Sequence, residues 1–220
     1  MLKLHLAILW SGRVFLISAL FCLMLLCIAM AFAGWLETPM DMHHAGWICL
    51  LLFVFSIVQI DLASSGNRAA IFVAMRQSDA FARGKFSIVF GLCAVFSALW
   101  CLMLAAVHDV WAESLWILLA MVVFSAIACH AMILNLEPNT VSLRPVQRHL
   151  LLLVVSGPWI LPAWILGLLA GGAALEGHDG IMQLMALVVL GLVQYAIGAL
   201  FRESQPNQTA TAIKPEQHKP

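Results

Sequence analysis

Charged residues are scarce in this sequence: only 10% of its 220 residues are Asp, Glu, Lys or Arg, whereas 63% are hydrophobic. A soluble domain carries about 25% charged and about 45–50% apolar residues. So little charge excludes an ordinary soluble domain, and so much apolar material excludes a disordered chain. The 11 basic residues only equal the 11 acidic ones, which argues against a nucleic-acid partner. The class that remains is an integral membrane protein.

The sequence also lacks the motifs of enzymes and of metal sites. Its six cysteines fall inside apolar runs without a C-x-x-C spacing, so we interpret them as small hydrophobic residues. There is no G-x-S-x-G, no H-E-x-x-H and no phosphate-binding loop. We expect no catalytic residue, metal or resident cofactor, and any ATP that drives the protein must bind another chain. Four histidines are expected on the outer surface, without a ligand spacing: His43, His44, His108 and His178.

Six apolar runs are each near the ~20 residues that a helix needs to cross about 30 Å of hydrocarbon. They are residues 14–33, 45–63, 86–107, 114–134, 150–175 and 181–201. Because barrel strands would show short alternating segments, we predict an all-α membrane protein with six transmembrane helices over 14–201. Residues 1–13 predict an interfacial helix on the inner leaflet, or an earlier start of the first span. Residues 202–220 predict a disordered cytoplasmic tail.

All eleven basic residues fall on one side of this arrangement. They precede the first span, follow the sixth, or lie between the second and third or the fourth and fifth. The other three connections hold no Lys or Arg and carry Glu37, Asp41, Asp109, Glu113, Glu176 and Asp179. The positive-inside rule therefore predicts that both termini are cytoplasmic.

The longest connection, residues 64–85, contains a seven-residue apolar stretch flanked by arginines. Ile71, Met75 and Ser78 share one helix face by their spacing. A short cytoplasmic helix of this kind would present an apolar face to a soluble partner, but it also fits a segment that rests on anionic lipid. The candidate docking residues are Arg68, Ile71, Phe72, Met75, Arg76, Phe81 and Arg83.

Three polar residues lie within or at the end of predicted spans. Gln59 and Asp61 are near the inner end of the second span, and His130 is near the inner end of the fourth. Intramembrane polar residues are functional candidates, although a structural role fits residues so close to the interface. They are too few for a proton pathway, so an ion-driven or proton-driven transporter is disfavoured.

The fifth span has an irregular sequence, with Gly157, Pro158 and Pro162 close together. Each proline removes a backbone donor and bends the helix. Such a bend either lines a cavity, provides a hinge, or is a static packing kink.

This fifth span also carries a resemblance to a known family. In residues 150–167 a leucine and valine run leads into Pro158-Trp-Ile-Leu-Pro162 and a further apolar run. With six spans and cytoplasmic termini, the chain resembles the haem exporter protein B (CcmB) family, whose members are membrane subunits of the cytochrome c maturation ABC transporter. In that family the place of residues 64–85 is taken by a cytoplasmic helix that docks on the ATPase subunit.

The resemblance implies an ABC-2-type permease-like fold in the bacterial inner membrane and a non-catalytic permease subunit that acts in haem delivery. The partners that it implies are an ATP-binding cassette ATPase subunit, a haem-handling membrane subunit, a small membrane subunit and, indirectly, a periplasmic haem chaperone. Haem would then belong to the complex, with no ligand named in this chain. The alternative is a stand-alone multi-pass assembly or scaffold protein without an ATPase partner.

Overall fold

The computed structural model of this chain describes residues 37–65, 79–134 and 145–203, which are almost entirely helical. The elements are α3 (Pro39–Ser65), α5 (Asp79–His108), α6 (Trp111–Cys129), the π-helix η1 (His130–Leu134), α7 (Pro145–Leu175) and α8 (Ile181–Glu203). No strand occurs in these three ranges, which confirms the predicted all-α class for the described part of the chain. The predicted interfacial helix over 1–13 and the predicted first span over 14–33 lie outside the described residues, as does the tail beyond residue 203.

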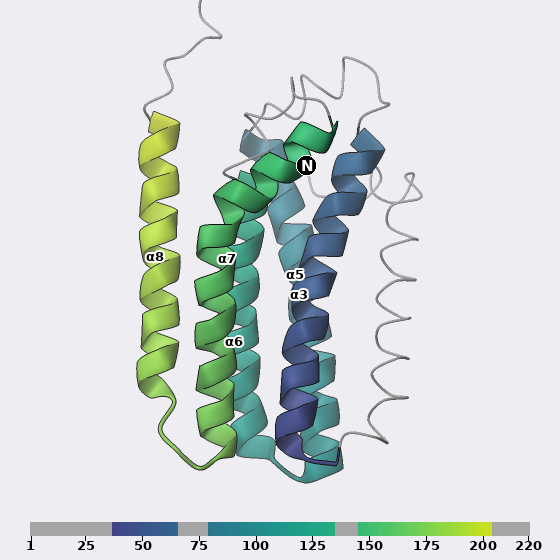
Figure 1. The fold of residues 1–220 in the computed structure, drawn as a ribbon, viewed down its shortest axis with the longest axis vertical. Helices are drawn as coiled ribbons and strands as arrows, with labels where there is room; N and C mark the ends of the chain where they lie inside the picture. The colour runs from purple at the N-terminus through teal and green to yellow at the C-terminus, as the bar shows by residue number, and fades with distance from the viewer. Residues whose placement is uncertain (1–36, 66–78, 135–144, 204–220) are drawn as a thin grey trace, which may run out of the picture.

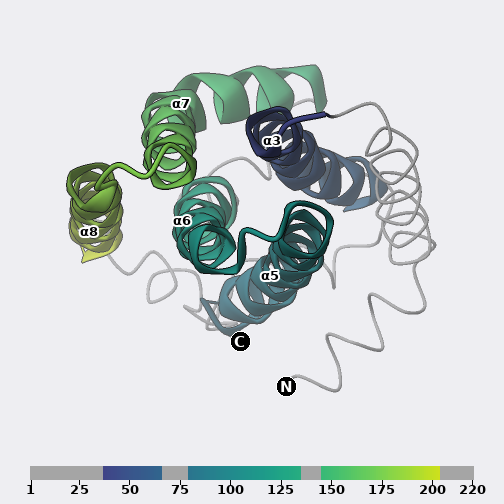
Figure 2. The same cartoon turned by 90° about the horizontal axis from the view of Figure 1, so that it is seen from below.

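The helices form an up-and-down bundle (Figure 1). Two short connections, residues 109–110 and 176–180, join α5 to α6 and α7 to α8 at the same end. Viewed along the bundle (Figure 2), α6 lies between α5 and α7, and α8 stands at the outside next to α7. Helix α3 packs against both α5 and α7. Each of the long described helices therefore runs antiparallel to the one that precedes it.

Four helical stretches are long and apolar enough to cross a membrane: Phe86–His108, Trp111–Met132, Val154–Leu175 and Ile181–Leu200. Helix α3, which is 27 residues long, is also apolar over Pro39–Phe55. Large apolar side chains point outward from these helices, and Leu115, Val154 and Met182 are each more than 60% exposed. Such surfaces are stable when lipid surrounds them. The described part of the chain thus fits a multi-pass membrane protein.

Helix α3 begins at Pro39, before the predicted span start at residue 45. Thr38 Oγ1 accepts a hydrogen bond from the Asp41 N–H at 3.1 Å and donates one to Asp41 Oδ2 at 2.6 Å. Proline suits the first helical position, and a threonine with an acidic residue three positions later satisfies the free N–H groups of a helix start. The prediction followed the apolar run alone and missed this capping signal.

Charged residues separate along the bundle. Six carboxylates lie at the end that holds the two short connections: Glu37, Asp41, Asp109, Glu113, Glu176 and Asp179. The Lys and Arg of the described ranges lie in α5, α7 and α8 at the opposite end: Arg83, Lys85, Arg148 and Arg202. We call these the acidic end and the basic end. Asp61, Asp79 and Glu203 also lie at the basic end, so only the basic residues are one-sided, as the positive-inside rule requires.

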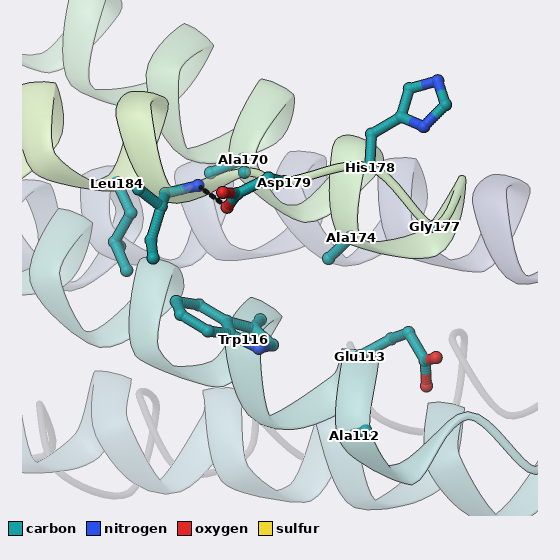
Figure 3. A pocket seen from close by; sticks show the side chains of 11 residues that line it. Ala112, Glu113, Trp116, Ala170, Ala174, Gly177, His178, Asp179 and Leu184 are labelled. Carbon is teal, nitrogen blue, oxygen red and sulfur yellow. Dashed lines mark hydrogen bonds between the residues drawn. The ribbon is translucent and has the colours of Figure 1, made fainter.

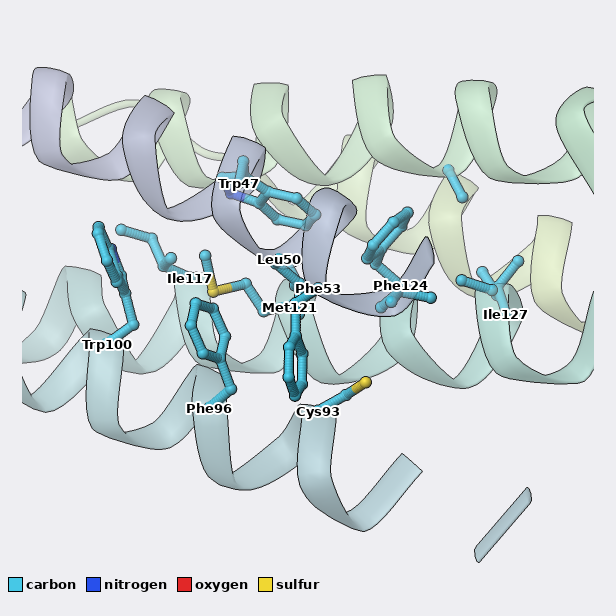
Figure 4. Packing of buried hydrophobic residues seen from close by; sticks show 14 of the residues in the cluster. Trp47, Leu50, Phe53, Cys93, Phe96, Trp100, Ile117, Met121, Phe124 and Ile127 are labelled. Carbon is cyan, nitrogen blue, oxygen red and sulfur yellow. The ribbon is translucent and has the colours of Figure 1, made fainter. Parts of the chain in front are cut away.

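The core is rich in aromatic rings that join α3, α5 and α6 (Figure 4). Phe53 stacks on Phe96 with ring centroids 5.3 Å apart, and Phe96 stacks on Trp100 at 6.0 Å. Trp47 meets Phe124 edge-on at 5.4 Å. Aromatic pairs at these separations add about 0.5–1.5 kcal/mol beyond their burial. This core holds α3, α5 and α6 together.

Candidate functional site

Most of the predicted docking segment falls outside the described residues, including Arg68, Ile71, Phe72, Met75 and Arg76. Phe81 and Arg83, which were expected in the connection, lie instead in the first turns of α5, because this helix begins at Asp79. Helix α3 ends and α5 begins at the basic end (Figure 1), so the segment between them starts and finishes there. Residues 79–85 of α5 contain three charged residues, whereas residues 86–107 of the same helix contain none.

The two prolines of the fifth predicted span lie inside a continuous α7. Figure 1 shows that the first part of this helix leans away from the rest. Pro158 has no N–H for the carbonyl of Val154 one turn earlier, which is the usual cause of such a bend. Pro158 and Pro162 are exposed, and a Cβ atom at Gly157 would meet nothing within 4 Å. The irregular part of α7 therefore faces the surroundings of the bundle.

Of the three predicted intramembrane polar residues, Gln59 and Asp61 lie in the last turns of α3 at the basic end. His130 is the first residue of η1, and its side chain is buried. At this position α6 changes from α-helical to π-helical hydrogen bonding. π-turns often occur at functional sites because they widen the helix locally.

His130 lines a cavity of about 480 Å³ between α5, α6 and α8. Phe86 borders it from α5, Ala126 and Ile127 from α6, and Gly191 and Tyr195 from α8. Nearly all of its surface is apolar. The volume lies within the range of about 300–1,000 Å³ that is usual for small-molecule sites. This cavity is the candidate functional site.

Aromatic contacts hold the His130 ring at one end of the cavity. Its centroid is 5.5 Å from that of Tyr195, with the planes tilted by 44°. Phe86 meets the imidazole edge-on at 6.5 Å and stacks on Phe90 at 5.7 Å. The imidazole is therefore placed by rings from two other helices.

A hydrogen bond from α8 fixes the turn that carries His130. Gln194 Nε2 donates to the carbonyl of Ile127 at 3.2 Å, and Gln194 is almost fully buried. The backbone N–H of His130 also reaches this carbonyl and that of Ala126. Sequence reasoning missed Gln194 and Tyr195. The available signal was a glutamine next to the chain's single tyrosine inside an apolar run.

A smaller cavity of about 210 Å³ lies at the acidic end, between α6, α7 and α8 (Figure 3). Glu113 and Trp116 border it, and the His178 side chain points away from Glu113. Asp179 Oδ1 accepts a hydrogen bond from the Ile181 N–H at 3.0 Å, at the start of α8. Nowhere in the described ranges do three or more His, Cys, Asp or Glu side chains gather as a metal site would require.

The expectation that His43 lies on the outer surface is wrong. His43 is in α3, is fully buried, and its Nε2 lies 3.0 Å from the carbonyl oxygen of Leu168 on α7. A carbonyl only accepts, so Nε2 donates in this hydrogen bond. The early start of α3 at the Thr38 cap explains the difference, because it places His43 on the helix face that meets α7. His44, the next residue, is exposed.

Two glycines of α7 receive side chains of α3. A Cβ atom at Gly167 would overlap the indole of Trp47, and one at Gly171 would overlap the His43 ring. Trp164 Nε1 also donates to the Trp47 carbonyl at 3.1 Å. Small residues four apart let membrane helices approach closely. The G-x-x-x-G spacing of 167 and 171 was the signal for this contact, and it was not used in the prediction.

The fold therefore defines a class, a multi-pass helical membrane protein with an apolar cavity near one membrane face. Comparisons of this chain with family models, curated proteins and solved structures find no match. A narrower assignment rests on the resemblance carried by residues 150–167 and on the arrangement of the helices.

Proposed function

We propose that this chain is the non-catalytic membrane subunit of an ABC-type complex that acts in haem delivery for cytochrome c maturation in the bacterial inner membrane. ATP would be hydrolysed on a separate ATPase chain, and haem would be a cargo of the complex. The remaining expected partners are a haem-handling membrane subunit, a small membrane subunit and, indirectly, a periplasmic haem chaperone.

The observation that carries this proposal is the extension of α5 beyond its span at the basic end. Residues 79–85 are helical and precede the uncharged stretch 86–107, and these seven residues amount to about 10 Å of helix at 1.5 Å per residue. The extension contains Phe81, Arg83 and Lys85. The basic end faces the cytoplasm by the positive-inside rule. A helix that leaves the membrane on that side suits a groove in a soluble ATPase.

The polar side chains of the bundle support a role without chemistry of its own. His43 bonds to the Leu168 carbonyl, Ser97 bonds to the Cys93 carbonyl at 2.8 Å, and Gln194 bonds to the Ile127 carbonyl. In these contacts each side chain satisfies a backbone group inside an apolar bundle. The His43 and Gln194 bonds join neighbouring helices and hold them in register, whereas the Ser97 bond lies within α5.

The test is recovery of the ATPase subunit with the tagged chain from detergent extract. Ile71→Asp would place a charge in the docking contact and desolvate it, at a cost of several kcal/mol. We expect normal membrane levels, with loss of ATPase recovery and of cytochrome c maturation. Gln77→Asp, in the same segment but off the Ile71 face, is the matched control.

Phe81→Asp extends the test to the described part of α5. We expect it also to lose ATPase recovery and cytochrome c maturation. Equal ATPase recovery from all variants and the wild type would contradict docking through this region. No ATPase in any preparation would favour the stand-alone scaffold alternative.

A further inference from the structure

The cavity beside His130 lies within the membrane-spanning part of the bundle. Phe86 belongs to the apolar stretch of α5, Val123 and Ala126 belong to the α6 span, and Val188 and Gly191 belong to the α8 span. The medium at this depth is lipid hydrocarbon. A cavity with an apolar lining in this medium suits an apolar chain better than a polar solute.

The aromatic and polar side chains of this cavity lie toward the basic end. His130 follows α6 where that helix approaches the basic end, and Tyr195 is in the second half of α8, 61% exposed. Val123 and Val188 line the deeper part, nearer the acidic end along the same helices. The cavity is thus apolar along its length, with an aromatic rim on the side where the basic residues lie.

Basic residues continue from this rim along two helices. Lys85 immediately precedes Phe86 on α5, and Arg202 lies about two turns beyond Tyr195 on α8. Basic positions between membrane helices on the cytoplasmic side favour anionic lipid headgroups. Aromatic rings prefer the level of those headgroups.

Two contacts hold α8 against α6 beside the cavity. A Cβ atom at Gly191 would lie 3.1 Å from Ile127 Cγ1, so α8 approaches α6 closely at this point. The Gln194 hydrogen bond to the Ile127 carbonyl is one turn further along α8. The space between the helices is therefore bounded by fixed contacts.

We propose that this cavity binds a phospholipid with an anionic headgroup. One acyl chain fills the apolar part between α5, α6 and α8, and the headgroup lies beyond the aromatic rim at the basic end. This site is independent of haem and of the ATPase, so it stands apart from the function proposed above.

The test uses the full chain reconstituted in phosphatidylcholine vesicles with a small fraction of phosphatidylglycerol that carries a photoreactive diazirine on one acyl chain. Mass spectrometry maps the adducts after illumination. We expect adducts on residues 123–130 and 188–195, and we expect unlabelled phosphatidylglycerol to compete about tenfold better than added phosphatidylcholine. The exposed face of α7 at Leu161 and Leu169 gives the level of general lipid contact.

Two neighbouring valines provide a matched pair. Val188→Trp fills the cavity and should abolish the mapped adducts, whereas Val189→Trp adds the same ring outside the lining and should leave them unchanged. Leu192→Trp is a second filling variant if Val188→Trp does not fold by circular dichroism and gel filtration. Equal labelling of α7 and the cavity, equal competition by the two lipids, or equal labelling of the paired variants would each overturn the proposal.

Discussion

The indole of Trp47 on α3 occupies the space that a Cβ atom would need at Gly167 on α7. One turn away, His43 has the same relationship to Gly171. Large side chains on one helix thus meet small residues on the other, and the Trp164 bond to the Trp47 carbonyl closes the contact. The position of α3 in the bundle depends on the absence of two side chains.

Alanine at Gly167 should therefore destabilise the protein. The added methyl overlaps a buried ring, and overpacking of this kind costs about 1–3 kcal/mol. Gly157→Ala is the control in the same helix, because its Cβ meets nothing within 4 Å and alanine favours a helix by about 0.5–1 kcal/mol. Thermal unfolding in detergent should move in opposite directions for the two variants. A Gly167→Ala protein as stable as Gly157→Ala would contradict the close contact.

Replacement of Gln194 by leucine should weaken the attachment of α8 to the π-turn. The change keeps an apolar volume but removes the bond to the Ile127 carbonyl, at a cost of about 0.6–1.7 kcal/mol in a membrane protein. Gln183→Leu is the matched control, because Gln183 Oε1 is buried without a hydrogen-bond partner among the described residues. Denaturation in mixed micelles should show a lower free energy of unfolding for Gln194→Leu and no decrease for Gln183→Leu. The reverse order would refute the role of Gln194.

Alanine at both Pro158 and Pro162 should straighten α7. Each proline costs a helix interior about 3 kcal/mol, so the doubly substituted helix should be locally more stable. If the bend is functional, cytochrome c maturation should fall while the amount of protein in the membrane stays normal. Maturation at the wild-type level in this variant would instead identify the bend as a static packing kink.

The charge separation predicts the orientation of the bundle. A reporter fused after Phe201 should be cytoplasmic, because α8 ends at the basic end. A reporter inserted next to Asp109 should be periplasmic, because the connection there is at the acidic end. Activity of paired alkaline phosphatase and fluorescent-protein fusions measures both positions. If both reporters were found on the same side of the membrane, the antiparallel arrangement would be ruled out.

The apolar runs predicted the ends of α7 and α8 that meet at their connection, since α7 ends at Leu175 and α8 begins at Ile181, as the runs do. They missed the start of α7, which begins at Pro145, five residues before the run. Hydrophobicity was a poorer guide at Thr38, where a capping interaction starts α3 in a polar stretch. It also missed the start of α5 at Asp79, because residues 79–85 are helical but include three charged residues. The length of an apolar run follows the thickness of the membrane, whereas a helix can extend beyond the membrane.

The candidate site was predicted only in part for a different reason. His130 stands out in the sequence as a polar residue in an apolar run, but its neighbours come from α5 and α8. Tyr195 and Phe86 meet it only because of the way α8 and α5 pack around α6. Helix pairing of this kind depends on tertiary contacts, which no local pattern in this sequence specifies.

The connection between α5 and α6 also bears on how the chain enters the membrane. Asp109 adopts a left-handed backbone with φ of 56°, and its Oδ1 accepts a hydrogen bond from the Trp111 indole at 3.1 Å. Because only residues 109–110 connect them, α5 and α6 cannot insert into the membrane independently of each other. Helices α5 and α6 should therefore enter as a hairpin, which carries the carboxylates of Asp109 and Glu113 across near its tip. Biogenesis would then proceed by pairs of helices.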